Sequence, residues 1–268
     1  MERKLILLAT SIVFLFACSN NSITGRSQLA LFPESTLQQQ ATTQYQSFLN
    51  ESKVVSQNTS KDAEMVKRVG TRIAQAITSY YAVKGLSKEL EGYNWEFNLV
   101  DNKEVNAWCM PGGKVVVYTG LLPITQNEAA LAIVLGHEIT HAVAHHGNER
   151  MSQGALAQGL QIAGNIFTQN KEKANALFNS VFAPGAQVAF LLPNSRKQEY
   201  EADHFGLNFA AMAGYNPKEA IPFWQRMSAA GSSNKPPEFL ATHPSDENRI
   251  AKIQSYMDEA LSYYKPRK

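Results

Sequence analysis

Four of the chain's six histidines lie in one short stretch, HEITHAVAHH, which begins at His137. The first two, His137 and His141, bracket Glu138 in the pattern H-E-x-x-H. Residues four apart share one face of a helix, so these two imidazoles can bind one metal ion together. Glu138 lies about 100° around the helix from His137 and is better placed to hold a metal-bound water than the metal. A zinc-activated water with Glu138 as general base is therefore the chemistry that this spacing predicts.

The surroundings of the motif favour a metal site over a pair of solvated surface histidines. The preceding residues, ALAIVLG, are apolar. In such a helix two imidazoles and a carboxylate are costly without a partner. Thr125 and Glu128 have the spacing of a capping box, which predicts that the helix begins there.

The next two histidines, His145 and His146, are poor candidates for the same ion. His145 lies about 12 Å along a continuous helix from His137. We therefore expect both to cap the C-terminal end of the helix, where imidazolium meets the negative end of the dipole. A metzincin would need a histidine where this chain has Gly147, which excludes that class.

A further ligand is expected from a second helix, in the stretch QEYEADHFG. Glu199 and Asp203 are four residues apart and share a face, so one can bind the metal while the other holds a histidine N–H. Ala202 would let a neighbouring helix approach closely. Glu201 points elsewhere on the helix and is predicted to be a solvated surface charge.

The first residues predict export. The basic start MERK precedes an apolar run from Leu5 to Ala17, which is too short to span a bilayer comfortably and fits a signal peptide. The run ends in LFAC, which resembles the lipobox of bacterial lipoproteins, with Phe16 larger than is usual. We predict a lipoprotein signal peptide at residues 1–17 and lipidation of Cys18. An ordinary signal peptide or an uncleaved anchor are the alternatives.

The remaining chain is predicted to form one α+β domain, mostly helical with a small sheet packed on the H-E-x-x-H helix. The 268 residues, 44% of them apolar, suffice for a single core. We expect a polar tether at residues 18–33 and the domain that holds the metal motif at 34–268. The first helix is expected to be capped by Ser35 and Gln38. With a net charge of +2 and scattered basic residues, no nucleic acid is expected as a partner.

Two further features are noted. The predicted strand at residues 114–118 lies just before the metal helix, where it is either an edge strand that pairs with an extended substrate or an interior strand. Only two cysteines exist, so lipidation of Cys18 would leave Cys109 without a disulfide partner.

Taken together, HEITH and EYEADHFG resemble the HtpX / CAAX-prenyl-endopeptidase family of gluzincin zinc metallopeptidases. The segments NAWCMPGGKVVVYTGLL, ATHPSDENRI and SITGRSQLALF are also similar to that family, the last to its BepA/LoiP-type envelope lipoproteases and their mitochondrial relative. The resemblance implies a zincin-like fold and one Zn²⁺ per chain. It implies the zinc ligands His137, His141 and Glu199, with Glu138 as base and Asp203 as support.

The same resemblance brings His243 near the zinc, where it would stabilise the oxyanion or block the open metal position; a capping or loop histidine is the alternative. Arg249 would contact the oxyanion or a carboxylate, or form a surface salt bridge. The implied function is a zinc endopeptidase of the bacterial cell envelope that acts on damaged or misassembled proteins. The alternative is a noncatalytic or self-blocked chaperone lipoprotein, although the intact Glu138 favours the enzyme. Because Ser19 is not acidic, we expect a lipid anchor in the outer membrane, with the protein facing the periplasm.

Overall fold

The computed structural model describes residues 18–157, 171–182, 195–231, 237–243 and 248–266. The signal peptide predicted at 1–17 lies outside these residues. The helices are α2 Glu34–Glu51, α3 Lys61–Val83, α4 Leu122–Thr125, α5 Glu128–Val143, α6 His146–Ala157, α8 Lys171–Phe182, α9 Arg196–Met212, α10 Ala220–Gly231, α11 Glu238–Thr242 and α12 Arg249–Tyr263. No helix in the described ranges is long and apolar enough to cross a membrane.

A small mixed sheet lies at the centre. Its strands are β3 Glu96–Val100, β4 Ala107–Met110 and β5 Lys114–Tyr118, in the order β3-β5-β4. The central strand β5 pairs in parallel with β3 and antiparallel with β4. The short strand β4 was not predicted, because its four residues show no clear alternation of apolar and polar side chains.

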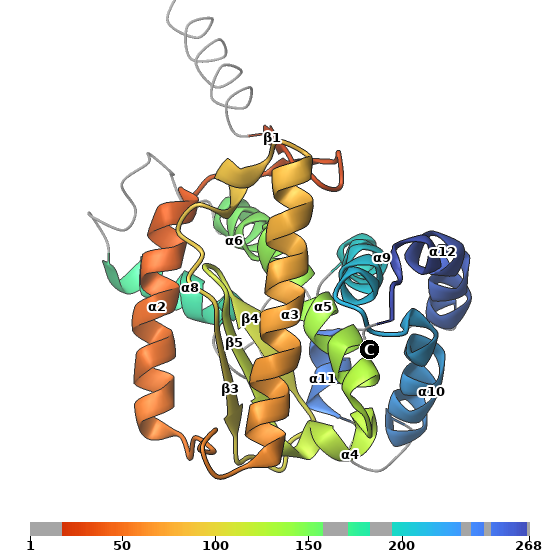
Figure 1. Cartoon of the computed structure of the whole chain (residues 1–268). Coiled ribbons are helices and arrows are strands. Elements are labelled where there is room, and N and C mark those ends of the chain that lie inside the picture. Colours follow the sequence, from red (N-terminus) through yellow and green to blue (C-terminus); the bar gives the residue numbers. More distant parts are fainter. Residues whose placement is uncertain (1–17, 158–170, 183–194, 232–236, 244–247, 267–268) are drawn as a thin grey trace, which may run out of the picture.

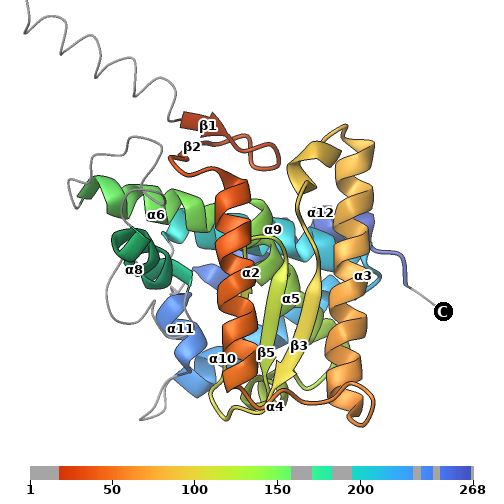
Figure 2. The same ribbon diagram turned by 90° about the vertical axis from the view of Figure 1, so that its left-hand side faces the viewer.

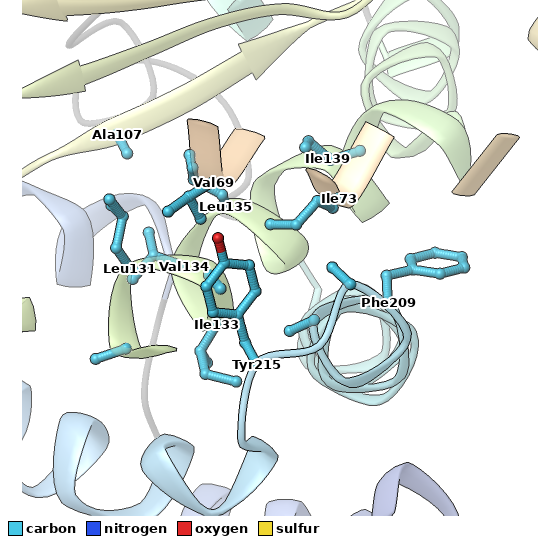
Figure 3. Packing of buried hydrophobic residues seen from close by; sticks show 14 of the residues in the cluster. Val69, Ile73, Ala107, Leu131, Ile133, Val134, Leu135, Ile139, Phe209 and Tyr215 are labelled. Atoms are coloured by element: carbon cyan, nitrogen blue, oxygen red, sulfur yellow. The ribbon is translucent and has the colours of Figure 1, made fainter. Parts of the chain in front are cut away.

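Helices cover both faces of this sheet (Figure 1). Successive strand residues point to opposite faces. On β5, Val115 and Val117 therefore join the core formed with α3, α5 and α9, while Val116 and Tyr118 face α2. Figure 3 shows the first of these cores, in which apolar side chains of α5 meet those of α3 and α9. The predicted mostly helical α+β fold, with a small sheet packed on the metal helix, is confirmed.

Two predicted helix starts are wrong in detail. Helix α5 begins at Glu128 and is capped by Asn127, whose side chain accepts a hydrogen bond from the Ala130 N–H at 2.8 Å. Thr125 instead ends the separate helix α4. The capping residue Asn127 stands directly before the apolar run, which is the position that an N-cap prefers.

The first helix, α2, also begins differently from the prediction. It follows Pro33, which makes no side-chain cap, so Ser35 and Gln38 form no capping box. The Gln38 side chain instead donates to the Glu91 carbonyl at 3.1 Å. The Gln38 side chain, which the local spacing predicted to cap the helix, is thus used in a tertiary contact instead.

The predicted polar tether at 18–33 is not an extended linker. Residues 18–29 form an antiparallel hairpin, β1 Cys18–Asn20 and β2 Ser27–Leu29, which we call the N-terminal hairpin. The hairpin lies at the end of the molecule near α6 (Figure 2). The segment that follows it is attached to α6, because Asn148 donates to the Phe32 carbonyl at 2.8 Å. The hairpin is therefore part of the folded body.

Candidate metal centre

Four buried side chains converge between α5, α9 and the end of α11. His137, His141, Glu199 and His243 each offer one ligand atom, and these atoms all lie within 4.8 Å of one another. The Nε2 atoms of His137 and His141 are 3.1 Å apart. Glu199 Oε1 lies 3.3 Å from His141 Nε2 and 3.1 Å from His243 Nδ1. The structure thus brings the three predicted ligands together and adds His243 as a fourth donor.

The crossing of α5 and α9 depends on two glycines. A Cβ atom at Gly136 would lie 2.5 Å from the Gly206 carbonyl oxygen, and one at Gly206 would lie 2.6 Å from the His137 nitrogen. Real Cβ atoms essentially never come so close to backbone. The helices can therefore approach only because both positions lack a side chain. This contact helps to set how closely Glu199 approaches the histidines, and Ala202, which is also completely buried on α9, agrees with the predicted close packing.

The donor set fits a cation. Two imidazole nitrogens face each other across 3.1 Å beside a carboxylate, all of them buried. Two histidines and one carboxylate are the protein ligands of a common class of catalytic zinc site. Glu138 Oε1 is also buried, and it makes no hydrogen bond with any described residue. Arg249 Nη2 lies 3.0 Å from Glu199 Oε2 and offsets part of the negative charge, but two imidazole nitrogens this close to each other still require a proton or a metal ion between them.

His137 is held directly by a carboxylate. Its Nδ1 lies 2.9 Å from Asp203 Oδ1, so its Nε2 faces the cluster. Arg249 donates to both oxygens of Asp203, at 2.8 and 2.9 Å, and its guanidinium carbon stacks 3.6 Å from the centre of the Trp224 ring. Of the three roles left open for Arg249, the structure selects the contact with a carboxylate. We call this arrangement the direct support.

The two histidines of the motif differ in charge preference. Burial alone would lower the pKa of His137, but the carboxylates of Glu199 and Asp203 outweigh it and raise that pKa to about 9. Burial holds the pKa of His141 well below its ordinary value. Burial likewise raises the pKa of Glu138, which brings it closer to the neutral range that a general base needs.

The turn after α5 places His146 unexpectedly. His145 adopts a left-handed backbone conformation, with φ of 55°, and separates α5 from α6. The chain therefore folds back, and His146 Nδ1 lies 2.8 Å from His141 Nδ1. His145 lies instead beside Glu34, with 3.2 Å between Nδ1 and Oε2. The prediction that both histidines cap the helix is wrong.

The N-terminal hairpin supplies the cap instead. Asn21 and Gln28 donate to the Ala144 carbonyl, at 2.9 and 3.2 Å, just beyond the last residue of α5. These amide groups satisfy a carbonyl that the helix itself leaves without a partner. The hairpin is thereby bound to the end of the metal helix.

Glu201 is not the solvated surface charge that was predicted. Its side chain is only 14% exposed, and its Oε2 lies 3.0 Å from His146 Nε2. Arg26 of the hairpin donates to Glu201 Oε1 at 2.7 Å and also contacts both oxygens of Glu149. Although burial raises the pKa of Glu201, its bonds to His146 and Arg26 outweigh this and lower it.

A cleft opens beside the cluster and is bordered by β4, Glu138, His141 and His243. Since residues 114–118 form the central strand β5, with β3 and β4 at the two edges, the interior alternative is right and the prediction of an edge strand that pairs with substrate is wrong. His243 Nε2 lies 3.3 Å from Glu138 Oε1, so this ring stands between the base and the other donors. Arg150 of α6 also lines the cleft, with one buried guanidinium nitrogen that has no partner among the described residues.

Sequence reasoning missed three of the residues around the cluster, namely His146, Glu201 and Arg26. The spacing H-E-x-x-H-x-x-x-x-H was visible, but a continuous helix would point its last histidine away. Arg26 is 175 positions from Glu201, and no periodicity links residues so far apart. Its one signal was its place in SITGRSQLALF, a segment already marked by resemblance.

Several named proteins are similar to this chain in sequence. The mitochondrial metalloendopeptidase OMA1 of Schizosaccharomyces pombe is 35% identical over 190 residues, covering 70% of this chain and 53% of that protein. The human mitochondrial metalloendopeptidase OMA1 is 32% identical over 250 residues, covering 89% of this chain and 46% of that protein. The beta-barrel assembly-enhancing protease of Escherichia coli is 28% identical over 169 residues, covering 59% and 33%.

The chain thus spans about half the length of the OMA1 proteins, and about a third of the beta-barrel assembly-enhancing protease. Identity to the OMA1 proteins is higher than to the bacterial protease, so the BepA/LoiP-type branch is not singled out. A family model, described as peptidase family M48, matches residues 60–257. This match contains the whole His137, His141 and Glu199 cluster and most of the chain, and on this ground the chain belongs to peptidase family M48.

Proposed function

We propose that this chain is a zinc-dependent endopeptidase. The observation that carries the proposal is the buried convergence of His137, His141 and Glu199 with Glu138 at the cleft beside them. Zinc, when held by these three ligands, polarises a peptide carbonyl and makes water acidic enough to react at neutral pH. The family match and the endopeptidase names of the relatives support the same reaction.

In this reaction Glu138 moves the protons. Its carboxylate takes the proton of the attacking water and delivers it to the nitrogen of the leaving amine. Burial raises the pKa of Glu138, so the protonated form between these steps is more accessible than on a solvated glutamate. Asp203 keeps the proton of His137 on Nδ1, which leaves Nε2 free to bind metal.

The edge strand β4 provides a place for the substrate. It runs along the cleft that contains Glu138, and in the described part of the chain its one strand neighbour is β5. An extended peptide can therefore add to its free edge through backbone hydrogen bonds. Such binding selects unfolded segments with little choice of sequence, which agrees with damaged or misassembled proteins as substrates.

The substitution Glu138→Gln tests the reaction. Glutamine preserves the size of the side chain but cannot take a proton, so zinc content and folding should be unchanged. Cleavage of unfolded casein should fall by roughly 10²- to 10⁴-fold. Glu128→Gln is the matched control, because Glu128 lies on the same helix, pairs with Arg68 and is far more exposed. Substantial cleavage by Glu138→Gln would remove the general-base mechanism.

A self-blocked resting state is the second candidate, and the position of His243 favours it. Its Nδ1 lies 3.2 Å from His137 Nε2, where an open metal position is required, while its Nε2 faces Glu138. One ring would then occupy the fourth metal position and contact the base at once. Activity would require this ring to move away.

His243→Ala separates the two roles that the sequence left open for this residue. Faster casein cleavage than in wild type supports the block, since removing the ring opens the fourth position. Slower cleavage with zinc retained supports stabilisation of the transition state instead. If zinc-loaded wild type and His243→Ala both fail to cleave varied unfolded proteins, the result favours the alternative of a noncatalytic chaperone.

We further propose that Cys18 carries a lipid and holds the protein in the bacterial envelope, at the outer membrane and facing the periplasm. The LFAC sequence and the non-acidic Ser19 support this proposal. The OMA1 relatives are named as mitochondrial, so location is the part of the proposal that most needs a test. Because Cys18 begins the N-terminal hairpin, a lipid there would hold the folded body close to the bilayer surface.

Mass spectrometry of protein extracted from membranes tests the anchor. A lipidated N-terminal Cys18 is expected, and Cys18→Ala should release the protein from the membrane fraction. An N-terminus at Met1, or an unmodified one elsewhere, contradicts the lipoprotein proposal and leaves the peptidase proposal intact.

A further inference from the structure

The two histidines of the motif are supported through different chains of contacts. His137 meets a carboxylate directly, as described above. His141 meets no carboxylate at Nδ1; its Nδ1 partner is His146, a ring that is completely buried. His146 in turn meets Glu201, and Glu201 meets Arg26 of the N-terminal hairpin. We call this arrangement, from Arg26 to His141, the relayed support.

The chemistry of the four groups sets the direction of each hydrogen bond. An ionised carboxylate only accepts, so His146 Nε2 donates its proton to Glu201 Oε2 across 3.0 Å. Between the two Nδ1 atoms, 2.8 Å apart, one nitrogen donates and the other accepts. If His141 accepted there, its own proton would be on Nε2, the atom that faces His137 and Glu199. Only the opposite arrangement, in which His141 Nδ1 donates to His146, leaves Nε2 free for a metal.

Arg26 fixes the far end of the chain. It donates through Nε to Glu201 Oε1 at 2.7 Å and through Nη2 to Glu201 Oε2 at 3.1 Å, and the same guanidinium binds Glu149. Its side chain is only 13% exposed, so these contacts are shielded from water and salt. The double contact keeps Glu201 ionised and holds its Oε2 toward His146.

We propose that His146, Glu201 and Arg26 are positioning residues of the metal centre, which fix the orientation and the tautomer of His141. The N-terminal hairpin is then a working part of this centre although it contributes no ligand. The inference rests on the proposed zinc site. It concerns residues that lie two steps or more from the metal.

Zinc affinity, measured without any substrate, tests this proposal. The full chain is titrated with Zn²⁺ in competition with a chelating indicator, and the metal-free fold is followed by thermal unfolding. Glu201→Gln should weaken zinc binding by about 10- to 100-fold, because an amide can donate to His146 and reverse the order of protons. Arg26→Gln should weaken it less, since Glu201 remains present.

Glu149→Gln is the matched control. It also removes an ion pair between Arg26 and a buried glutamate, but the His146 side chain donates its hydrogen bond to Glu201 and not to Glu149. Its loss of zinc affinity should be clearly smaller than that of Glu201→Gln, because the hydrogen bond between Glu201 and His146 is kept. Equal losses in Glu149→Gln and Glu201→Gln would overturn the proposal, since the hairpin would then act only as an anchor.

A second pair of variants decides the matter if Glu201→Gln does not fold. His146→Gln retains a carbonyl oxygen that can accept from His141 Nδ1, whereas His146→Leu has a similar volume and no acceptor. Affinity should be higher in His146→Gln than in His146→Leu, and the Co²⁺-loaded proteins should differ in their visible spectra. Equal affinities would overturn the proposal. A wild type that takes up no zinc would instead overturn the proposed function.

Discussion

The direct support and the relayed support each orient one histidine of the metal centre, but they are built from different parts of the chain. In the direct support, Asp203 lies on the same helix as the ligand Glu199, and Arg249 comes from the last helix. In the relayed support, Glu201 lies on that helix too, but it reaches His141 through a second imidazole and is held by the N-terminal hairpin. Both supports end in an arginine that binds a carboxylate on α9.

This difference shows how one helix serves two ligands. Glu199, Glu201 and Asp203 alternate along α9, so Glu201 leaves it on a side different from that of the other two. Asp203 can therefore meet His137 directly, while His141 needs a ring that spans the gap. The turn at His145 brings that ring back. No carboxylate of α9 contacts His141 Nδ1 in the described structure, so the His146 ring connects His141 to Glu201.

The largest effect should come from a change that disturbs both supports together. A methyl group at Gly206 would lie 2.6 Å from the His137 backbone nitrogen, so Gly206→Ala must push α9 away from α5. We expect the free energy of unfolding to fall by about 1–3 kcal/mol, as for overpacking. Zinc affinity should fall by more than about 100-fold, because the ligand and both carboxylates move at once.

Zinc titration and thermal unfolding measure these two effects. Gly231→Ala is the control, since among the described residues its new methyl group would meet the end of the Leu240 side chain, which can move. If Gly206→Ala bound zinc as tightly as wild type, the close crossing of α5 and α9 would not be what positions the ligands.

A smaller effect should distinguish the direct support from the relayed one. Asp203→Asn keeps an oxygen beside His137 Nδ1 but removes the negative charge, so zinc affinity should fall by about 10- to 100-fold. The loss should exceed that of His146→Gln, because a charge at 2.9 Å acts on its imidazole more strongly than a neutral ring does. Indicator competition on the two variants, side by side, makes the comparison. The reverse order would show the relayed support to be the more important.

The same comparison explains what the sequence could and could not predict. The pair His137 and His141 and the pair Glu199 and Asp203 were identifiable because residues four apart on one helix share a face. Spacing left open which carboxylate binds the metal, and the family resemblance implied that it is Glu199. The relayed support depends on the left-handed turn at His145, and a non-glycine residue in that conformation is too uncommon to be expected from the sequence. Glu201 was read as a surface charge because the helix that covers it lies elsewhere in the chain.

The helices and strands also divide into those that the sequence could predict and those that it could not. The metal helix α5 and the carboxylate helix α9 were both predicted, since the spacing of their functional residues is local. The strand β4 and the N-terminal hairpin were missed. Both are short. The hairpin is bound to α5, far along the chain, whereas β4 pairs with the next strand, β5, but its four residues show no alternation of apolar and polar side chains.

The smallest expected effect, the response to pH, tests whether the two supports leave their histidines in different charge states. The carboxylates of Glu199 and Asp203 raise the pKa of His137 to about 9, so this ring is protonated at neutral pH in the metal-free protein. Burial keeps His141 neutral there. Zinc must therefore displace about one proton, and its affinity should rise about tenfold per pH unit up to about pH 9 and then level off.

The stability of the metal-free protein should change with pH in the opposite direction to its zinc affinity. Because the folded pKa of His137 is raised above 6.5, its contribution to stability is fully present below that pH and is lost as pH rises through about 9. Metal-free protein should thus become less stable over the range in which zinc binds more tightly. Calorimetric titration in buffers of different ionisation enthalpy counts the released proton directly. Asp203→Asn should lower that count, because its His137 has lost the carboxylate that held the proton, whereas His146→Gln should leave it near one. A count near two in wild type would mean that the relayed support also leaves its histidine charged, and the contrast between the two supports would be lost.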